Sequence, residues 1–422
     1  MLPLAGIRVL EFCDIWIGPT LCSFLGDLGA EVWKIETIHR MSPSRGLHAN
    51  PPRGPTYPGM EPGGMPFNRN SYFNAHNRSK YGFTLDVRDE ETRSRFLELA
   101  SVCDALVENF PAGGLAKLGV GYDTLRRARP DIVLLSLSPY GQTGPYRSHN
   151  TFGFCIDSMC GHASLRGYRG DDITQTAPAY PQDPGGVHVG MFALLAAMHH
   201  RHRTGEGQWI DLSQAEAYID RIGESIVDYS MNRRVPERMG NRHEVMAPHG
   251  VYPCRGTDRW VTIAVASDNE WRRLCEAMGD PAWSRDAKFA TKQGRQQNAK
   301  ELDRRLADWT RTRDDHATML VLQAHRIMCS PVMDARQLFE DPHLRARGFF
   351  EPIVHPTAGR HEYPGRAWRF SETPAAIQRP ANLLGEHNDL LFHSLLGMRP
   401  EHVTRMRDKG LIGDRFATGA EH

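Results

Sequence analysis

The sequence predicts an α/β protein, with a parallel sheet covered by helices in its N-terminal part and a smaller α+β domain further along. Three observations lead to this fold class. Short apolar segments alternate with amphipathic segments of helical period over about the first 140 residues, which is typical of a helix-covered parallel sheet. A polar segment around residue 240 then precedes a new group of strand and helix patterns. Finally, 422 residues are enough for two or three domains, since chains beyond about 250–300 residues usually divide.

The chain begins with a strand–helix–strand pattern. GIRVLEF (6–12) predicts a strand, TLCSFLGDLGA (20–30) an amphipathic helix that ends at glycine, and EVWKIE (31–36) a second strand. The alternation continues through YGFTLDV (81–87), ETRSRFLELASV (91–102), DALVENF (104–110), TLRRARP (124–130) and DIVLLSLSPYG (131–141). Such alternation predicts a parallel sheet with helices in the connections.

Residues 41–70 interrupt this alternation. They contain seven prolines and five glycines, which prevent either regular period. A segment of this length without regular structure inside a domain is usually a lid, a binding loop or a mobile insertion. The sequence leaves a lid and a solvated insertion equally open.

The second half of the chain has weaker patterns. A long apolar helix ends near TGEGQ (204–208), and the helical segment 214–234 leads to a polar connection. WVTIAVAS (260–267) then predicts a strand and NEWRRLCEAMG (269–279) a helix of a smaller α+β domain. In the tail, EPIVHP (351–356) and RAWRF (366–370) predict short strands.

Composition excludes several classes of partner. The 51 basic and 50 acidic side chains nearly cancel, so no net field favours nucleic acid or an anionic membrane. No segment reaches the about 18–20 apolar residues of a membrane span, and the N-terminus lacks the pattern of a signal peptide. The eight cysteines are scattered, without a CxxC pair. We therefore expect a soluble, cytoplasmic protein with reduced cysteines.

The sequence gives little support to nicotinamide binding, to a histidine metal site or to the common catalytic motifs. Nicotinamide binding lacks the GxGxxG pattern, although Glu36 follows the first helix at a suitable distance. The histidines at 199, 200 and 202 lie where a helix ends before Gly205, and adjacent histidines point in different directions, so we expect no metal site. GxSxG, HExxH and P-loop motifs are absent, which removes the commonest hydrolase, zinc protease and NTPase hypotheses.

Asp183, in QDPGG, supports two interpretations. Asp followed by Pro is a good helix start, so local grounds favour a helix cap. A carboxylate at the positive end of a helix also stays ionised, and Gly185 and Gly186 would let a bulky substrate approach and expose N–H groups to an oxyanion. These are the requirements of a carboxylate nucleophile that attacks a thioester.

The order of motifs along nearly the whole chain resembles the class III CoA-transferase family. The segments are LAGIRVLEF, LGDLGAEVWKIE, NRSKYGFTLDV, DALVENF, GGLAKLGVGYDTL, SLSPYGQTGP, QDPGGVHVGMFALLAAMHHRHRTGEGQWIDLSQAEA, GNRHEVMAPHGVYP, DPHLRARGFF and LLGEHN. Each motif is loose by itself, and the order makes the set specific. The family includes transferases of several acids and an acyl-CoA racemase.

The resemblance implies a Rossmann-like large domain with a parallel sheet built from both chain ends, a smaller inserted α+β domain, and an interlocked dimer. The corresponding ranges are 1–212 for the N-terminal part of the large domain, 213–239 for a helical linker, 240–330 for the small domain, and 331–422 for a linker and the C-terminal return to the large domain. A homodimer is expected, and a heteromer with a homologous chain is the alternative.

The resemblance also implies the chemistry. Asp183 would attack an acyl-CoA to form a mixed anhydride, then an aspartyl-CoA thioester from which an acceptor acid collects the CoA. Acyl-CoA, with succinyl-CoA as one candidate donor, and a carboxylic acid are the implied substrates, and no prosthetic group is implied. The residues that match the family's CoA contacts are Ile15, Trp16, Ile17, Arg45, Leu85, Arg88, Asn109, Phe110 and Lys117.

Two departures from the family pattern bear on the substrate. Trp16 stands where formyl-CoA transferase has a small polar amide, which makes oxalate-like substrates doubtful and hints at a larger or aromatic acceptor. The racemase has a histidine followed by an aspartate in the segment where this chain has Thr151 to Phe154. A racemase or isomerase on this scaffold would therefore lack one of its two bases.

Overall fold

The computed structural model describes residues 1–46, 51–177, 179–417 and 419–420. Its contacts divide the chain into two units. The first contains residues 1–162, 178–227 and 346–422, and the second contains residues 163–177 and 228–345. The first unit thus takes in both ends of the chain, and the inserted unit is wider than the range of 240–330 expected for the small domain.

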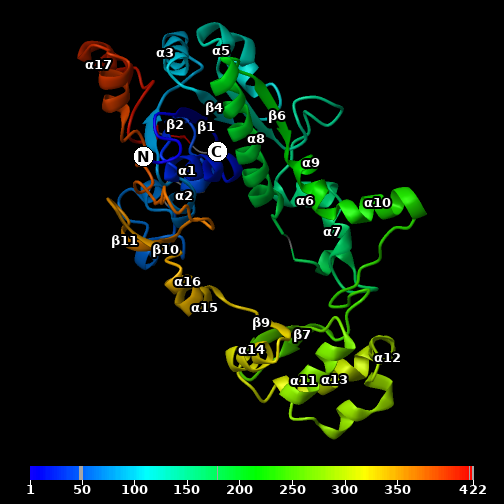
Figure 1. Ribbon diagram of the computed structural model, residues 1–422. Coiled ribbons are helices and arrows are strands. Elements are labelled where there is room, and N and C mark those ends of the chain that lie inside the picture. Colours follow the sequence, from blue (N-terminus) through cyan, green and yellow to red (C-terminus); the bar gives the residue numbers. More distant parts are fainter. Residues whose placement is uncertain (47–50, 178, 418, 421–422) are drawn as a thin grey trace. The chain divides into compact units, whose positions relative to one another are not determined.

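A six-stranded parallel sheet forms the centre of the first unit (Figure 1). Its strands are β1 (Arg8–Phe12), β2 (Glu31–Glu36), β3 (Tyr81–Thr84), β4 (Ala105–Glu108), β5 (Val133–Ser138) and β6 (Trp209–Ser213). They lie in the order β3-β2-β1-β4-β5-β6, and all neighbouring pairs are parallel. This is the strand order of the doubly wound Rossmann-like fold. The order reverses between β1 and β4, and such sheets bind ligands at the carboxyl ends of the strands beside this point.

Both faces of the sheet are apolar and covered. Val9 and Leu10 of β1 are 2% and 0% exposed and belong to different hydrophobic clusters. The helices over the Val9 face are α1 (Ile17–Asp27) and α8 (Gln182–Thr204), and those over the Leu10 face include α3 (Glu90–Ser101) and α5 (Tyr122–Ala128). Burial of both faces is typical of a parallel sheet between two helical layers. The predicted α/β class is confirmed.

The C-terminal segment returns to the first unit, and its described residues add no strand to the parallel sheet. It contains the antiparallel hairpin β10 (Phe350–His355) and β11 (Gly359–Pro364), a π-helical turn (Leu390–Leu395) and α17 (Pro400–Asp408). The LLGEHN segment covers the edge strand β3: Asn388 accepts the N–H of Thr84 at 2.8 Å, and the N–H of His387 donates to the carbonyl of Gly82 at 2.8 Å. The expectation that both chain ends build the sheet is therefore wrong. Its strands all come from residues 8–213, and the returning end instead protects a sheet edge.

The second unit is α+β, as predicted. Its antiparallel sheet has the order β7-β8-β9, with β7 (His249–Pro253), β8 (Trp260–Ala264) and β9 (Met328–Pro331). The helices that share its core are α11 (Asp268–Ala277), α13 (Ala299–Thr310) and α14 (Asp315–Ala324). Ile263 of β8 and Leu274 of α11 lie in this core, 1% and 0% exposed.

Shorter helices complete the chain. They are α2 (Ser71–His76), α4 (Gly114–Lys117), α6 (Gly153–Met159), α7 (His162–Leu165), α9 (Gln214–Ile219), α10 (Gly223–Asn232), α12 (Lys292–Gln297), α15 (Ala335–Glu340) and α16 (Pro342–Ala346). RAWRF (366–370) is not a strand, because β10 pairs instead with residues 359–364. Among the described residues, no helix combines the length and apolar character needed to cross a bilayer.

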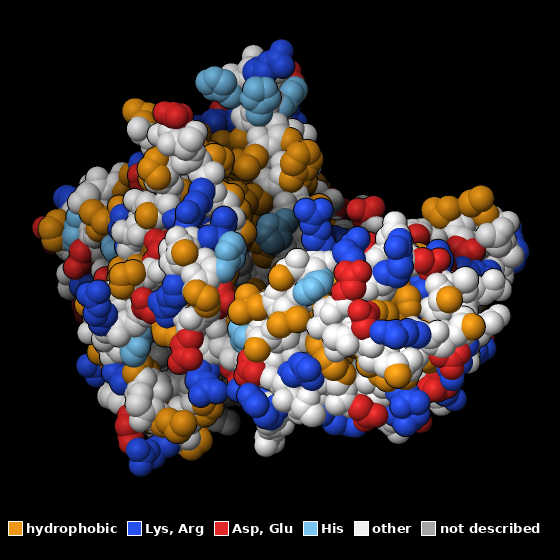
Figure 2. Space-filling view, turned by 60° about the horizontal axis from the view of Figure 1, so that its bottom comes forward, with side chains coloured by type: hydrophobic (Ala, Val, Ile, Leu, Met, Phe, Trp, Pro, Cys, Tyr) orange, Lys and Arg blue, Asp and Glu red, His pale blue; other side chains and the backbone are white. Residues whose placement is uncertain are grey.

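Charged side chains of both signs are interspersed over the face of the molecule in Figure 2. This face therefore carries no large patch of one sign, in agreement with the nearly balanced composition. An electrostatic footprint for a polyanion would require such a patch.

Candidate active site

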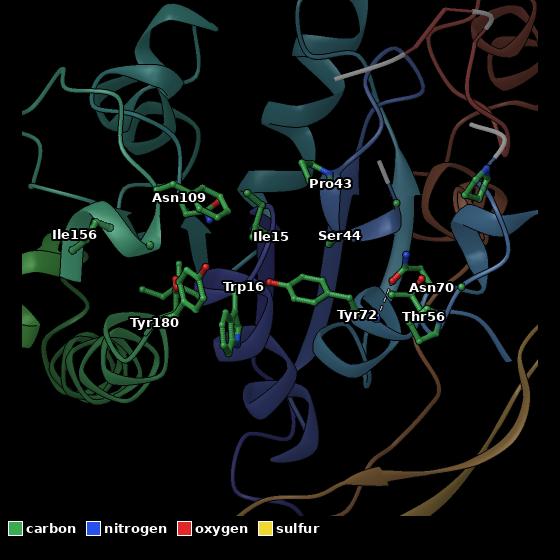
Figure 3. A pocket seen from close by; sticks show the side chains of 18 of the residues that line it. Ile15, Trp16, Pro43, Ser44, Thr56, Asn70, Tyr72, Asn109, Ile156 and Tyr180 are labelled. Atoms are coloured by element: carbon green, nitrogen blue, oxygen red, sulfur yellow. Dashed lines mark hydrogen bonds between the residues drawn. The ribbon is translucent and has the colours of Figure 1, made fainter. Parts of the chain in front are cut away.

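A cavity of about 760 Å³ lies in the first unit, next to the point where the strand order reverses. Its walls come from the turn after β1, residues 43–46 and 51–57, the start of α2, and the beginnings of α6 and α8. Figure 3 shows Tyr72 and Tyr180 on opposite sides of Trp16, with the hydroxyl of Tyr72 directed toward Trp16. The segment 41–70 therefore lines a cavity, with residues 47–50 outside the described part of the chain.

Asp183 lies on the wall of this cavity, in the first turn of α8. Its Oδ2 atom is 3.4 Å from the side-chain nitrogen of Gln182. Burial raises the pKa of Asp183 to about 6. The effect of burial therefore exceeds that of the positive helix end, which favours the charged carboxylate. The carboxylate is mostly ionised at pH 7, and it is less well solvated than a surface carboxylate, which favours reaction with an electrophile.

Asp183 does not cap the helix. The capping position is Pro181, and Asp183 is the second helical residue, so the local preference for a cap was wrong. Two of the first four positions of the helix end, Pro181 and Pro184, have no N–H, which leaves few donors for a cap to satisfy. The side chain is consequently free to face the cavity.

The two glycines after Asp183 lie within α8. The N–H of Gly185 donates to the carbonyl of Pro181 at 3.0 Å, so it is already used by the helix. A Cβ on Gly186 would lie 2.5 Å from the end of the Ile17 side chain, so glycine leaves room here for the present position of that side chain between α8 and α1. The expected oxyanion role of Gly185 is contradicted by this hydrogen bond, and the structure gives Gly186 a packing role instead.

A third glycine lies against the carboxylate. A Cβ on Gly153, at the start of α6, would lie 3.3 Å from Oδ2 of Asp183 and 2.6 Å from the side-chain nitrogen of Gln182. Phe152 and Gly153 both line the cavity beside Asp183. The described residues that line the cavity include no histidine, cysteine, lysine or second carboxylate. Two-base proton exchange therefore finds no histidine or second carboxylate among them.

The turn between β1 and α1 is held in a strained conformation. Ile15 has φ +64°, which is rare for a β-branched residue and costs about 1–3 kcal/mol. Both polar atoms of the Asn109 side chain bond the backbone of Asp14 at 2.8 Å, and Oδ1 of Asp14 accepts the N–H of Ile15 at 2.8 Å. These bonds fix Ile15 and Trp16 on the cavity wall.

A second cavity, of about 430 Å³, lies at the carboxyl ends of β1 to β4. Ile15 and Asn109 line both cavities, so the two adjoin at the turn after β1. The cations with exposed side chains on the wall of the second cavity are Arg40 and Arg88, at the ends of β2 and β3. Each is paired with an aspartate at 3.0 Å or less. This is the region where sheets of this topology bind nucleotides.

Arg45 has a structural position that the sequence did not indicate. It is 1% exposed, and its guanidinium bonds both carboxylate oxygens of Glu36 at 2.6 Å and stacks 3.6 Å from the ring centre of Phe73. A third nitrogen donates to the side chain of Asn68 at 2.9 Å. The expected contact of Arg45 with CoA is contradicted, because every part of the guanidinium is already engaged. Arg45 instead ties the segment 43–68 to the end of β2.

The other site residues expected from the sequence divide into three groups. Ile15, Trp16, Ile17, Asn109 and Asp183 line the larger cavity, whereas Ile15, Leu85, Arg88, Asn109 and Phe110 line the smaller one. Lys117 is exposed and lines neither cavity. It precedes Leu118, which does line the smaller one.

Sequence reasoning missed Tyr72, Tyr180 and Arg40. Burial, with the nearby carboxylates of Asp183 and Asp14, raises the pKa of Tyr72 to about 12, so its hydroxyl remains a donor at any physiological pH. Tyr72 follows a proline-rich segment without periodicity, and no signal there could have found it. Arg40 could have been found, since it follows the carboxyl end of β2 in a parallel sheet.

Comparison with known proteins identifies the family of this chain. The family model described as CoA-transferase family III matches residues 4–388. A succinyl-CoA:mesaconate CoA-transferase of Haloarcula hispanica is 31% identical, over 95% of this chain and 98% of the relative. A succinyl-CoA–D-citramalate CoA-transferase of Chloroflexus aurantiacus is 28% identical, over 97% of this chain and 98% of the relative.

A third relative and a solved structure extend the comparison. The beta subunit of a succinyl-CoA–L-malate CoA-transferase of Chloroflexus aurantiacus is 30% identical, over 97% of this chain and 98% of the relative. The crystal structure of a CAIB/BAIF family protein from Brucella suis superimposes with a TM-score of 0.82 at 27% identity, covering 93% of this chain and 99% of that one. The chain belongs to CoA-transferase family III and is a CoA-transferase.

Proposed function

We propose that this enzyme moves CoA from an acyl-CoA thioester to a free carboxylic acid, with Asp183 as the nucleophile. The observation that carries the proposal is a single, partly desolvated carboxylate on the wall of a large cavity that adjoins a nucleotide-sized cavity at the switch point of the sheet. The nucleotide end of CoA fits the smaller cavity, where Arg40 and Arg88 offer charge to its phosphates. The pantetheine arm then passes Ile15 and Asn109 toward Asp183.

The reaction is a sequence of acyl transfers. Asp183 attacks the thioester carbonyl and expels CoA thiolate, which leaves a mixed anhydride. The thiolate attacks the aspartyl carbonyl of the anhydride and expels the donor's carboxylate, which leaves an aspartyl-CoA thioester. The acceptor carboxylate attacks this thioester and expels thiolate, and the thiolate finally attacks the acceptor's carbonyl and releases Asp183. Each step exchanges one bond for another, so the energy of the thioester is kept if water is excluded.

Trapping with hydroxylamine tests the proposal. Enzyme incubated with an acyl-CoA and hydroxylamine should carry a hydroxamate on the peptide that contains Asp183, detected by mass spectrometry. Succinyl-CoA, the donor named for the relatives, and 3-phenylpropanoyl-CoA should both be used. Glu108 is the internal control, since it is also a buried carboxyl, with a pKa raised to about 7 by burial. A hydroxamate on Glu108, or none at all with either donor, would contradict the proposal.

The proposed nucleophile predicts a pH dependence. Asp183 must be ionised to attack, and burial raises its pKa to about 6. The single-turnover rate of CoA release should therefore be level above pH 7 and fall about tenfold per pH unit below 6. The Glu108→Gln variant should keep this inflection. A rate that stays level down to pH 5 would argue against Asp183.

We infer from the family resemblance that the active assembly is an interlocked homodimer. One relative is named a beta subunit. A heteromer with a homologous chain is therefore the alternative assembly, and the presence of Asp183 would make this chain its catalytic member.

A further inference from the structure

We propose that the acid that reacts at Asp183 has one carboxylate on a large apolar body, such as an aryl or branched alkyl group. The proposal rests on the function proposed above and names its substrate class. It separates this chain from the relatives, whose names specify the small dicarboxylic acids citramalate, malate and mesaconate.

The cavity wall around Asp183 is apolar and wide. Trp16, Tyr72 and Tyr180 present rings to the cavity (Figure 3). Ile156 and Phe152 also line it. The cavity volume of about 760 Å³ is in the range of pockets that hold drug-sized ligands. It has room for the end of a pantetheine arm together with an aryl acid, and a four-carbon diacid would leave much of the wall without contact.

The ring of His76 packs against Trp16 and supports its position. The ring of His76 lies 5.4 Å from that of Trp16 and 4.9 Å from that of Tyr72. Burial lowers the pKa of His76 to about 4, and its Nδ1 is 2.9 Å from the hydroxyl of Thr20. A neutral, hydrogen-bonded imidazole thus supports the aromatic wall and offers no charge to a substrate.

The described wall of the cavity has no buried cation for a second carboxylate. Among the described lining residues, the charged side chains are those of Asp183 and Arg53. The Arg53 side chain is 73% exposed and already paired with Glu61. A dicarboxylate would therefore place one carboxylate in the cavity without a buried cation to pair with, beside the negative charge of Asp183, and neutral donors such as Asn70 and Gln214 compensate such a charge less well. A single carboxylate at the reacting end avoids this, because it can accept from the hydroxyl of Tyr72.

Acylation of the enzyme by two donors tests the substrate class. Hydroxamate formation at Asp183 should be about 10- to 100-fold faster with 3-phenylpropanoyl-CoA than with succinyl-CoA at equal concentration, because an unpaired buried charge discriminates strongly. As acceptors, 3-phenylpropanoate should exceed malate and mesaconate by a similar factor in kcat/KM. Equal rates, or faster reaction of the diacids, would overturn the substrate class and leave the proposed function intact. No hydroxamate from either donor would overturn both.

A pair of variants at the start of α6, one at the capping position and one within the helix, makes the test specific to charge. Phe152 lines the cavity and Phe154 does not, and their side chains are similarly exposed, at 53% and 51%. Phe152→Arg would place a cation beside the cavity and should shift the donor ratio at least about fivefold toward succinyl-CoA, while Phe154→Arg should leave the ratio unchanged. Circular dichroism would show whether both variants are folded. If they are, an unchanged donor ratio in Phe152→Arg would refute the idea that charge causes the preference between the two donors.

Discussion

Replacement of Asp183 by asparagine is expected to reduce CoA transfer by at least about 10⁴-fold, since loss of a covalent nucleophile removes the only route to the acyl-enzyme. Asparagine keeps the volume of the side chain and the hydrogen-bonding capacity toward Gln182. The cavity should therefore remain intact, and the affinity for CoA should change less than about threefold. Steady-state transfer assays and isothermal titration with CoA measure the two quantities.

The matched control lies in the other carboxyl with a raised pKa. Glu108 ends β4, accepts the N–H of Phe110 at 2.6 Å, and lines neither of the two cavities at the switch point. Glu108→Gln should retain most of the transfer activity. Activity of Asp183→Asn within tenfold of the parent would show that another group is the nucleophile.

Asp183→Asn should also change the thermal stability of the protein, in a direction that follows from the pKa of Asp183. Because the pKa of Asp183 is raised in the folded protein, the acid form favours folding and the carboxylate opposes it. This penalty is absent below about pH 4 and complete above about pH 6 to 7. Asp183→Asn should therefore raise the melting temperature at pH 8 and leave it unchanged at pH 4. A higher melting temperature would also show that the loss of activity does not come from unfolding.

The positions of the strands could be predicted from the sequence, but the order of the strands and the place of the C-terminal segment could not. Each strand of β1 to β5 is a short apolar run beside a helical pattern, so local hydrophobicity is enough to locate it. The strand order and the fate of the C-terminal segment depend on contacts between distant residues, such as the bond of Asn388 to Thr84. No local period encodes such a bond, and the expectation for the sheet failed at this point.

The residues of the candidate site also divide into those with a recognisable sequence pattern and those whose position depends on distant contacts. Asp183, Trp16 and Asn109 come from segments that have a strong local or family pattern, and the structure places all three on one cavity. Arg45 was misassigned because a sequence does not reveal that Glu36 and Phe73 enclose its guanidinium. Tyr72 was missed because its position depends on how a proline-rich segment folds back onto the sheet.

The second prediction with a large expected effect concerns a cluster of buried charges beneath the site. Glu11, Lys34 and Lys80 are each 2% exposed or less, with Oε1 of Glu11 2.9 Å from Lys34 Nζ and Oε2 2.7 Å from Lys80 Nζ. Burial alone would raise the pKa of Glu11, but the two ammonium groups outweigh it and hold this pKa below its usual value. Glu11→Ala removes the shared carboxylate and leaves two buried cations near each other. We expect a loss of about 3–5 kcal/mol in the free energy of unfolding at pH 7.

The pair Arg95–Glu98 provides the control for this measurement. It joins the half-buried Arg95 to the exposed Glu98 three residues later on α3, and Glu98→Ala should cost less than about 0.5 kcal/mol in urea unfolding followed by tryptophan fluorescence. The pH dependence gives an independent check: because the pKa of Glu11 is lowered on folding, its contribution is present above about pH 5 and is lost as the pH falls through its folded value. The difference between the parent and Glu11→Ala should shrink accordingly in acid.

The charge cluster also connects stability to catalysis. Lys34 donates to the carbonyl of Cys13 at 2.8 Å, and Lys80 donates to that of Pro19 at 2.7 Å. These two carbonyls lie on either side of the strained turn that carries Ile15 and Trp16. Loss of Glu11 should therefore raise the KM for the acyl-CoA as well as lower stability, whereas Glu98→Ala should change neither. A Glu11→Ala variant with full stability and an unchanged KM would show that the lysines are held by the backbone alone.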